Sequence, residues 1–484
     1  MVDAPVLSVS SGAVRGVRVG ESDRYLGIPY AAPPFGTRRF RPPAPAEPWD
    51  GVRDASRFGP TAPQSAYVGG LATYLPTVEI AGDDILTLNV WTPADRPADA
   101  RLPVLVFVHG GALARGTTAL PGYDGGTFAR AGIVFVSIQY RLGQEGFAVL
   151  EGVPRNLGVL DQAAALRWVR REIDRFGGDP ARVTAMGHSA GASTLTALLA
   201  RPDAAELFDR AILQSGPLGA QTPEKAGRMT KAIAQRLGVP ATRDAFDAIQ
   251  PAVLVRQQTA IAAGGSPLGG APTVALAIGG DAVPRDPLTA LVEGAGRGIP
   301  VMIGSTSEEY RLWFVPSGAL GKVRRSTLTL ARIAARVPAR IVRAHRSRRP
   351  EALPGEVLGE IMSDLLLRGP LTRFADSRTD AAAPTYVYEF RWRSPLDGMG
   401  AAHAMELGFV FDSLAAPDSI ALGGPDAPQL LADVMHRAWV RFVIDGDPGW
   451  ERWSERRPVQ AFDADGGHID YAPRAEELAG LPAR

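Results

Sequence analysis

A serine lies between two glycines in the segment Gly187-His188-Ser189-Ala190-Gly191, which satisfies the pattern G-x-S-x-G. The segment separates a short apolar run, RVTAM, from a helix-forming run, STLTALLA. In such a strand-to-helix turn the backbone is strained and the serine hydroxyl projects above the edge of a sheet. The flanking positions need glycine because a Cβ atom would clash, and the next helix aims its first amides at a developing oxyanion. The pattern therefore indicates a nucleophilic Ser189. The alternative is a turn that merely needs small residues.

A nucleophilic serine needs a base that accepts its proton. In α/β-hydrolases the chain order is serine, acid, histidine, so the base must come well after Ser189. Three histidines satisfy this order: His403, His436 and His468. His403 is favoured because it lies in an expected loop, GAAHAMELGFVF, and loops carry functional residues more often than regular elements do.

A carboxylate must orient that base, and it is expected at the end of a strand between the serine and the histidine. The run VMIGSTSEEY offers Glu308 and Glu309 directly after an apolar strand-like segment. Asp281 and Asp286 are weaker candidates, because they lie in a less regular segment.

Backbone amides must stabilise the anion that forms at the carbonyl group. The segment HGGAL, from His109 to Leu113, follows the strand-like run VLVFV, where a Gly-rich turn can present such amides. A plain Gly-Gly loop at the end of a strand is the alternative interpretation.

Apolar runs alternate with helical patterns along the chain. The runs ILTLNVWTP, LPVLVFVHG, GIVFVSIQY, RVTAMG, RAILQSG, PVMIGSTSEE and PTYVYEFRW are short and β-branched, as is typical of strands buried on both faces. The segments LGVLDQAAALRWVRREIDRFGG, AGASTLTALLA and QLLADVMHRAWVRFVIDG predict helices. VLSVSSGAVRGVRV predicts an N-terminal hairpin with a Ser-Gly turn. This alternation predicts an α/β fold with a large, mostly parallel central sheet and helices on both faces.

We expect one domain over residues 1–484, with helical insertions at about 222–298 and 310–380. The stretch 322–349 is basic, and Arg332, Arg336, Arg340 and Arg343 recur at helical spacing. A solvated helix face explains them better than an anion-binding surface does, since no aromatic stacking platform accompanies them.

Composition excludes several function classes. The 484 residues include no cysteine, so a disulfide framework and a thiolate site are impossible. A net charge of +1 gives no global bias toward nucleic acid or a membrane surface. The N-terminus has no signal-peptide pattern, and the apolar runs are too short to span a bilayer. We therefore expect a soluble, cytoplasmic protein without cofactor, metal, nucleic-acid or membrane partner, and a monomer or weak homo-oligomer.

Taken together, these segments resemble the carboxylesterase type-B (cholinesterase-like) family of α/β-hydrolases, and especially bacterial p-nitrobenzyl-type esterases. The resemblance runs from about Val6 to Tyr471. It is carried by the segments YLGIPYAAPPFGTRRFRPP, VFVHGGAL, NLGVLDQAAALRWVRREIDRFGGDPARVTAMGHSAGAST, IGSTSEE and HAMELGFVF. It implies the α/β-hydrolase fold, with helical insertions around an active-site gorge.

The resemblance implies a role for each matching residue. Ser189 corresponds to the nucleophile, His403 to the general base and acid, and Glu309 rather than Glu308 to the triad acid. The oxyanion-hole amides correspond to Gly111, Ala112 and Ala190. Ser215 corresponds to a supporting serine near the histidine and the acid. Arg141 and Asp161 correspond to an internal salt bridge with a structural role.

The sequence departs from the family pattern at four places. His188 replaces a glutamate before the nucleophile, which changes the charge beside the site. Ala112 replaces an oxyanion-hole glycine, and Tyr310 replaces the glycine after the acid. Ala62 and Ile85 replace an early cysteine pair, in keeping with a reducing cytoplasm.

The expected function is hydrolysis of aryl or short-to-medium acyl esters through an acyl-enzyme, with a small-molecule ester as partner. A non-catalytic binding or adhesion protein is the alternative, but such family members lack triad residues that are present here. Near the motifs lie apolar residues that could line the gorge or belong to the core: Leu113, Leu218, Tyr310, Trp313, Phe314 and Phe409.

Overall fold

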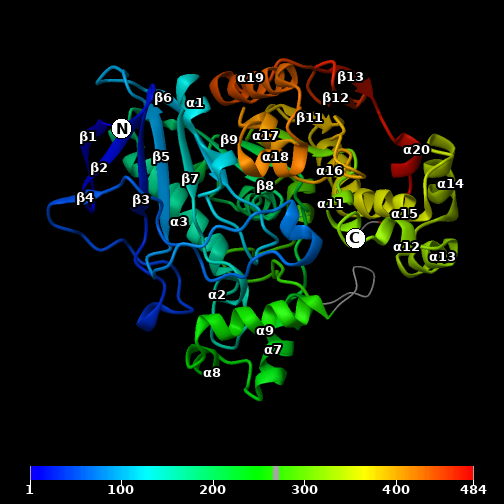
Figure 1. Cartoon of the computed structure of the whole chain (residues 1–484), viewed down its shortest axis with the longest axis horizontal. Helices are drawn as coiled ribbons and strands as arrows, with labels where there is room; N and C mark the ends of the chain where they lie inside the picture. Colours follow the sequence, from blue (N-terminus) through cyan, green and yellow to red (C-terminus); the bar gives the residue numbers. More distant parts are fainter. Residues whose placement is uncertain (1, 265–271, 483–484) are drawn as a thin grey trace.

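A central sheet crosses the whole molecule in the computed structural model, which describes residues 2–264 and 272–482 (Figure 1). Its strand order is β1-β2-β3-β5-β7-β6-β8-β9-β10-β11-β12-β13, and β4 pairs with β2. The strands are β1 (Val2–Val9), β2 (Gly12–Val19), β3 (Ser22–Pro29), β4 (Val52–Asp54), β5 (Thr87–Pro93), β6 (Leu102–Val108), β7 (Val134–Ile138), β8 (Gly178–His188), β9 (Arg210–Gln214), β10 (Val301–Thr306), β11 (Thr385–Phe390), β12 (Pro458–Phe462) and β13 (His468–Tyr471).

The middle of the sheet is parallel, and its margins are antiparallel apart from β4, which runs parallel to β2. Every pair from β7·β6 through β11·β12 is parallel, whereas β1·β2, β2·β3, β3·β5, β5·β7 and β12·β13 are antiparallel. The predicted mostly parallel sheet and the predicted N-terminal hairpin are confirmed. Because β6, β8 and β10 point the same way, their carboxyl ends meet at one edge, where open α/β sheets place their sites.

The pleat of β6 divides its side chains between two cores. Val104, Val106 and Val108 pack with residues of α3 (Leu157–Glu172) and α4 (Ala190–Leu199) on one face. Leu105 and Phe107 pack with residues of α1 (Gly126–Arg130) and α19 (Gln429–Asp445) on the other face. Burial of every one of these strand residues explains why the run LPVLVFV is apolar throughout.

The two segments expected as insertions are helical and have small cores of their own. Residues 228–263 form the lower projection in Figure 1, and residues 319–363 lie on its right-hand side. Residues 222–298 contain α6 (Pro223–Ala226), α7 (Arg228–Leu237), α8 (Arg243–Asp247), α9 (Pro251–Ala263) and α10 (Pro287–Val292). Residues 310–380 contain α11 (Arg311–Phe314), α12 (Ala319–Lys322), α13 (Arg325–Ala334), α14 (Ala339–Arg348), α15 (Pro354–Ser363), the π-helical turn η5 (Asp364–Arg368) and α16 (Gly369–Asp376).

The remaining helices are short and connect the strands. They are α2 (Gly143–Phe147), α5 (Ala204–Leu207), α17 (Leu407–Val410), α18 (Pro417–Gly423), α20 (Ala475–Leu478) and the 3₁₀ turns η1 (Gly36–Arg38), η2 (Gly69–Thr73), η3 (Pro121–Tyr123) and η4 (Ile173–Phe176). Among the described residues, no helix combines the length and apolar character needed to cross a bilayer.

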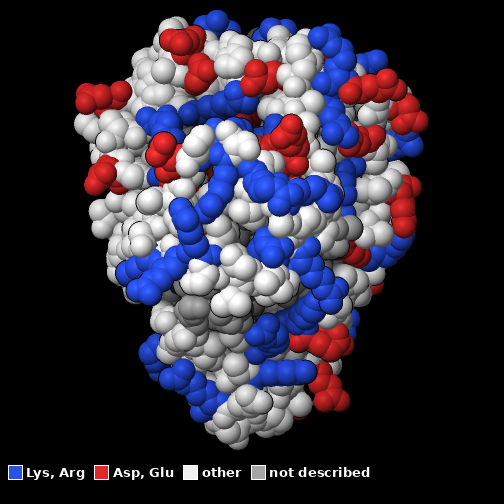
Figure 2. Space-filling view, turned by 90° about the vertical axis from the view of Figure 1, so that its right-hand side faces the viewer, with Lys and Arg blue, Asp and Glu red and all other residues white. Residues whose placement is uncertain are grey.

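The basic stretch 322–349 forms two helices, α13 and α14, rather than one continuous face. Pro338 stands at the N-cap of α14, where a proline interrupts a helix that precedes it. Arg336, Arg340 and Arg343 are exposed, and Figure 2 shows basic side chains spread over this side of the molecule. Arg332 is half-buried and donates to the carbonyl oxygen of Val337, so it links α13 to the turn that follows it.

A buried ion pair fastens the loop after β7 to α3. Arg141 Nη2 and Nε donate to the two carboxylate oxygens of Asp161 at 2.6 and 2.8 Å, and the Arg141 amide donates to Asp161 at 3.1 Å. Both side chains are at most 1% exposed. The bidentate geometry and the third bond compensate the loss of hydration, so the pair has the structural role expected from the sequence.

We expect Asp161→Asn to lower the free energy of unfolding by about 3–5 kcal/mol, because it leaves a buried guanidinium without its countercharge. Urea unfolding followed by circular dichroism measures the change. Glu293→Gln serves as the control: its pair with Arg285 is exposed, at 60% and 53%, and its loss is expected to cost less than about 1 kcal/mol. Equal effects of the two substitutions would contradict this account of Asp161.

Candidate active site

Ser189 lies at a sharp turn between the end of β8 and the start of α4. Its backbone has φ 55° and ψ −120°, a region that non-glycine residues rarely occupy. Two hydrogen bonds hold it there: its amide donates to the Gln214 carbonyl at 2.8 Å, and the Ser193 amide donates to its carbonyl at 3.0 Å. The surrounding structure thus maintains the strain that projects the hydroxyl into the pocket.

The glycines around this turn are required by close approach. A Cβ atom at Gly191 would lie 2.1 Å from the Val108 carbonyl oxygen, and one at Gly187 would lie 2.6 Å from the backbone of Gly191. The turn therefore packs directly against the end of the neighbouring strand β6.

Ser189, His403 and Glu309 form one continuous line of hydrogen bonds. The Ser189 hydroxyl lies 2.8 Å from His403 Nε2, and His403 Nδ1 lies 2.5 Å from Glu309 Oε2. The other carboxylate oxygen of Glu309 accepts from the Thr306 amide at 2.8 Å and from the Ser215 hydroxyl at 2.6 Å. A carboxylate on Nδ1 fixes the ring hydrogen there, which leaves Nε2 free to accept a proton.

Burial and charge act in opposite directions on His403. Burial by itself would lower its pKa, but the charge of Glu309 and the hydrogen bond to it raise the pKa above the ordinary 6.5. The imidazole ring also lies against two other rings, His188 at 4.7 Å and Trp313 at 4.9 Å between centroids. These contacts fix the ring plane within the line of hydrogen bonds.

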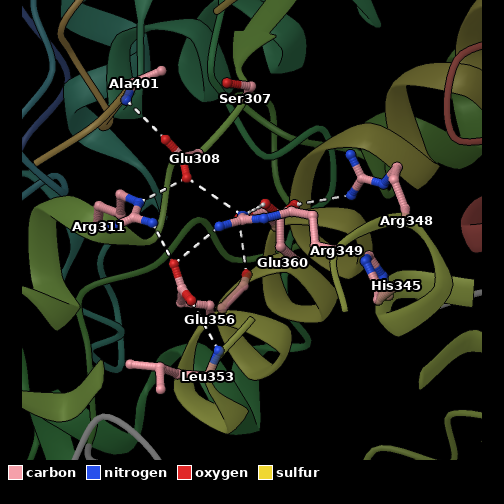
Figure 3. A network of polar contacts seen from close by, with 12 residues as sticks. Ser307, Glu308, Arg311, His345, Arg348, Arg349, Leu353, Glu356, Glu360 and Ala401 are labelled. Atoms are coloured by element: carbon pink, nitrogen blue, oxygen red, sulfur yellow. Dashed lines mark hydrogen bonds and ion pairs between the residues drawn. The ribbon is translucent and has the colours of Figure 1, made fainter. Parts of the chain in front are cut away.

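Glu308 points into a network of arginines (Figure 3). Its carboxylate accepts from Arg311 Nε at 2.8 Å and from the Ala401 amide at 3.2 Å. Arg349 lies 3.4 Å away and bridges to Glu356. Despite the cost of burial, the charges of Arg311 and Arg393 lower the pKa of Glu308. The two adjacent glutamates therefore differ in position, and only Glu309 reaches His403.

The other candidates for acid and base lie in different surroundings. His436 Nδ1 donates to the Val410 carbonyl oxygen at 2.8 Å and the ring packs on Phe128, whereas His468 is an exposed residue of β13 beside Asp463. Asp286 accepts from the Thr289 amide and caps α10, and Asp281 is exposed.

The loop after β6 presents backbone amides beside Ser189. Within the described chain, the amides of Gly111, Ala112 and Ala190 donate to no protein acceptor. Gly111 has φ 117°, and a Cβ atom there would lie 1.9 Å from the Arg115 carbonyl oxygen. Ala112 has φ 56°, in the left-handed region, so the alanine adopts the backbone shape at some energetic cost.

His109 opens this loop without facing the serine. Its ring stacks on Tyr140 at 4.7 Å, and Nδ1 lies 2.8 Å from the Gly110 carbonyl oxygen. Burial lowers the pKa of His109 to about 4, so the ring is neutral at neutral pH. Its role is to shape the loop.

A cavity of 180 Å³ opens onto the Ser189 hydroxyl and the His403 ring. Its walls are mainly apolar and come from the loop at residues 64–78, from α11 and from the segment 404–422. The apolar and aromatic lining residues are Tyr67, Leu71, Tyr74, Leu75, Leu120, Tyr123, Leu312, Trp313, Met405, Leu407 and Leu422. Residues 2–264 and 272–482 contain no group of three or more His, Asp or Glu side chains arranged to hold a metal ion.

Of the six residues expected to line the pocket, Trp313 alone does so. The structure corrects the other five. Their side chains are at most 5% exposed and pack in hydrophobic cores, because the neighbouring backbone turns them toward the sheet or into the second insertion. They are Leu113, Leu218, Tyr310, Phe314 and Phe409.

Sequence reasoning missed two contributors to this site. The loop at residues 64–78 carries no motif, and only the folded chain brings it over Ser189. Glu406 lies three residues after His403 in a segment that was recognised, and it is completely buried beside the triad. A carboxylate in an otherwise apolar run, AMELGFVF, was the signal that could have revealed it.

The model of the carboxylesterase family matches residues 3–464. The para-nitrobenzyl esterase of Bacillus subtilis (strain 168) is 34% identical over 464 residues, which cover 92% of this chain and 91% of that protein. The phenmedipham hydrolase of Pseudarthrobacter oxydans is 35% identical over 467 residues, which cover 93% of this chain and 91% of that protein.

Solved structures give the same result for the fold. The carboxylesterase EST55 of Geobacillus stearothermophilus superposes with a TM-score of 0.88 at 33% identity, covering 99% of this chain and all of that one. Both the sequence and the three-dimensional match extend over nearly the whole chain, so fold and family agree. The chain therefore belongs to the carboxylesterase type-B family and is a carboxylic ester hydrolase with the α/β-hydrolase fold.

Proposed function

We propose that the chain hydrolyses esters through an acyl-enzyme intermediate, with Ser189 as nucleophile, His403 as general base and acid, and Glu309 as the orienting carboxylate. The observation that carries this proposal is the line of hydrogen bonds from Ser189 Oγ through His403 to Glu309, at 2.8 and 2.5 Å, beside amides with no protein acceptor. A hydroxyl, a base and an orienting acid in this geometry are the parts that acyl transfer needs.

The reaction has two parallel halves. Ser189 Oγ attacks the ester carbonyl carbon while its proton passes to His403 Nε2. The amides of Gly111, Ala112 and Ala190 stabilise the oxyanion. The intermediate collapses, and His403 returns the proton to the departing alcohol. Water then attacks the acyl-enzyme, loses its proton to Nε2 and releases the acid, and Ser189 recovers its hydrogen.

The pocket favours aryl and short-to-medium acyl esters. Tyr74, Leu75 and Trp313 give it apolar and aromatic walls, and the cavity of 180 Å³ leaves little room for a long acyl chain. A relative with 34% identity is named a para-nitrobenzyl esterase, which agrees with an aryl-containing substrate.

We expect Ser189→Ala to lower kcat for p-nitrophenyl acetate by about 10⁴-fold or more, because no other hydroxyl occupies the attacking position. The same substitution is expected to abolish covalent labelling by a fluorophosphonate, detected by intact-protein mass spectrometry. Ser347→Ala, on the exposed surface of α14, is the control and should retain both properties. Full activity of Ser189→Ala would refute Ser189 as the nucleophile.

The pH dependence of kcat/KM reports the pKa of the general base, His403. Because Glu309 raises the pKa of His403, we expect kcat/KM to fall on acidification with a midpoint above pH 6.5, as His403 gains its proton. Glu309→Gln removes the charge that raises this pKa, so the midpoint should move to lower pH by about 1–3 units while kcat falls. The exposed Glu351 supplies the control, Glu351→Gln. A wild-type midpoint below 6.5, or no movement in Glu309→Gln, would contradict the assignment.

Two substitutions at Ala112 test the oxyanion amides. Ala112→Gly keeps the N–H and removes the strain at φ 56°, so kcat should stay within about threefold of wild type. Ala112→Val puts a β-branched side chain into the left-handed region and displaces the N–H, so kcat should fall by as much as 10²–10³-fold with little change in KM. Steady-state kinetics with p-nitrophenyl acetate measure both. Equal kcat in the two variants would show that the Ala112 amide is not part of the oxyanion hole.

A further inference from the structure

A second buried carboxylate lies beside the triad, and the reaction described above does not use it. Glu406 precedes α17 and is completely buried. Its Oε1 lies 3.3 Å from Ser215 Oγ and 3.9 Å from His188 Nε2. Within the described chain, neither Glu406 Oε2 nor His188 Nε2 has a hydrogen-bond partner. Two neighbouring buried side chains beside His403 thus each carry a polar atom without a partner.

The single hydroxyl hydrogen of Ser215 bears on whether Glu406 is ionised or protonated. The Ser215 hydroxyl has one hydrogen, and it lies closer to Glu309, at 2.6 Å, than to Glu406, at 3.3 Å. Once that hydrogen points to Glu309, Ser215 Oγ can only accept from Glu406. The second contact is therefore a hydrogen bond if Glu406 carries a proton, and a repulsion between lone pairs if it does not.

The charged and titratable groups around Glu406 also favour its protonated, neutral form. Glu309 and His403 face Glu406 from the triad, His188 faces it from β8, and the Tyr388 hydroxyl faces it from β11. Within the part of the chain that the structure describes, no arginine or lysine forms an ion pair with Glu406. A second carboxylate charge would be buried beside Glu309 without a full countercharge.

The pKa values agree with this arrangement. Burial, and after it the charge of Glu309, raises the pKa of Glu406 to about 7. Burial, and after it His403, lowers the pKa of His188 well below 6.5. Below pH 7 the proton therefore rests on Glu406, with His188 as its neutral neighbour.

We propose that Glu406 holds a proton beside the neutral ring of His188, next to His403, so that the buried site carries the negative charge of Glu309 alone. His403 then interacts with one carboxylate charge instead of two, and its imidazole stays available as a base near neutral pH. His188 and Glu406 are positioning residues in this scheme, since neither touches the reacting atoms. The consequence for His403 rests on the proposed function, whereas the proton itself does not.

Infrared spectroscopy tests the proton independently of hydrolysis. In Ser189→Ala protein at pH 6, we expect a C=O band from a protonated carboxyl group that disappears when Glu406→Gln is added and that fades as the pH rises through about 7. Glu172→Gln is the matched control: it removes a buried carboxylate whose pKa is lowered, so the band should remain. No loss of band in Glu406→Gln would overturn the proposal even if the triad assignment holds.

The pH profile supplies a second readout in the active enzyme. Glutamine is neutral at every pH, so Glu406→Gln imitates the protonated acid and should move the acidic midpoint of kcat/KM by less than about half a pH unit. If Glu406 is ionised in the wild type, loss of its charge beside His403 would move the midpoint down by about 1–3 units, and that result would refute the proposal.

A substitution of His188 tests the proposal even if the Glu406→Gln protein does not fold. In Ser189→Ala protein, His188→Gln exchanges the ring nitrogen for an amide, so the carboxyl band should persist but change frequency as its neighbour changes. An unchanged frequency and an unchanged titration would show that His188 is not the partner of Glu406.

Discussion

The contact between Gly191, in the first turn of α4, and Val108, at the end of β6, is the constraint on which the site depends. With room for only a hydrogen at Gly191, α4 begins directly against the end of β6, and the chain must pass through the strained conformation at Ser189. The same contact places the hydroxyl next to the loop that starts at His109. The Ser189 hydroxyl and the amides of Gly111 and Ala112 thus come together through backbone packing, before any side-chain interaction between them.

Sheet polarity extends this arrangement to the other residues of the site. The strands β6, β8 and β10 are parallel, so the chain leaves each of them at the same edge, and Glu309 follows β10 as Ser189 follows β8. His403 arrives from a longer loop after β11. The hydrogen bonds of Glu309 to Thr306 and Ser215 hold the acid in place, and the acid in turn holds the ring of His403.

The carboxyl groups of Glu308 and Glu406, which lie on opposite sides of Glu309, have different electrostatic surroundings. Glu308 is surrounded by arginines and is stabilised as an anion (Figure 3). Behind Glu309 no such cations are present among the described residues, and Glu406 there has His188 as a neighbour instead. An arginine on that side would attract negative charge but would also lower the basicity of His403. A neutral proton-holding pair avoids both a second anion and a competing cation.

Much of this protein followed from its sequence. The apolar strand runs, the turn around Ser189, the loop at His109 and the resemblance to a known family predicted the mostly parallel sheet, and they singled out Ser189, Glu309 and His403, which lie in one line of hydrogen bonds. These features are local, because the spacing of apolar residues and the steric demands of glycine act within a few positions. The sequence alone left His436 and His468 open as bases, and it gave Leu113 and Phe409 as pocket residues although both are buried in cores.

Only the tertiary structure decided which way the side chains point and what lies beside them. Adjacent glutamates, Glu308 and Glu309, face opposite surroundings, and the loop at residues 64–78 covers a serine more than a hundred positions away. The approach of Glu406 to His188 likewise joins segments that share no pattern. Contacts of this kind depend on how the strand ends and loops pack together, and no short-range periodicity records that packing.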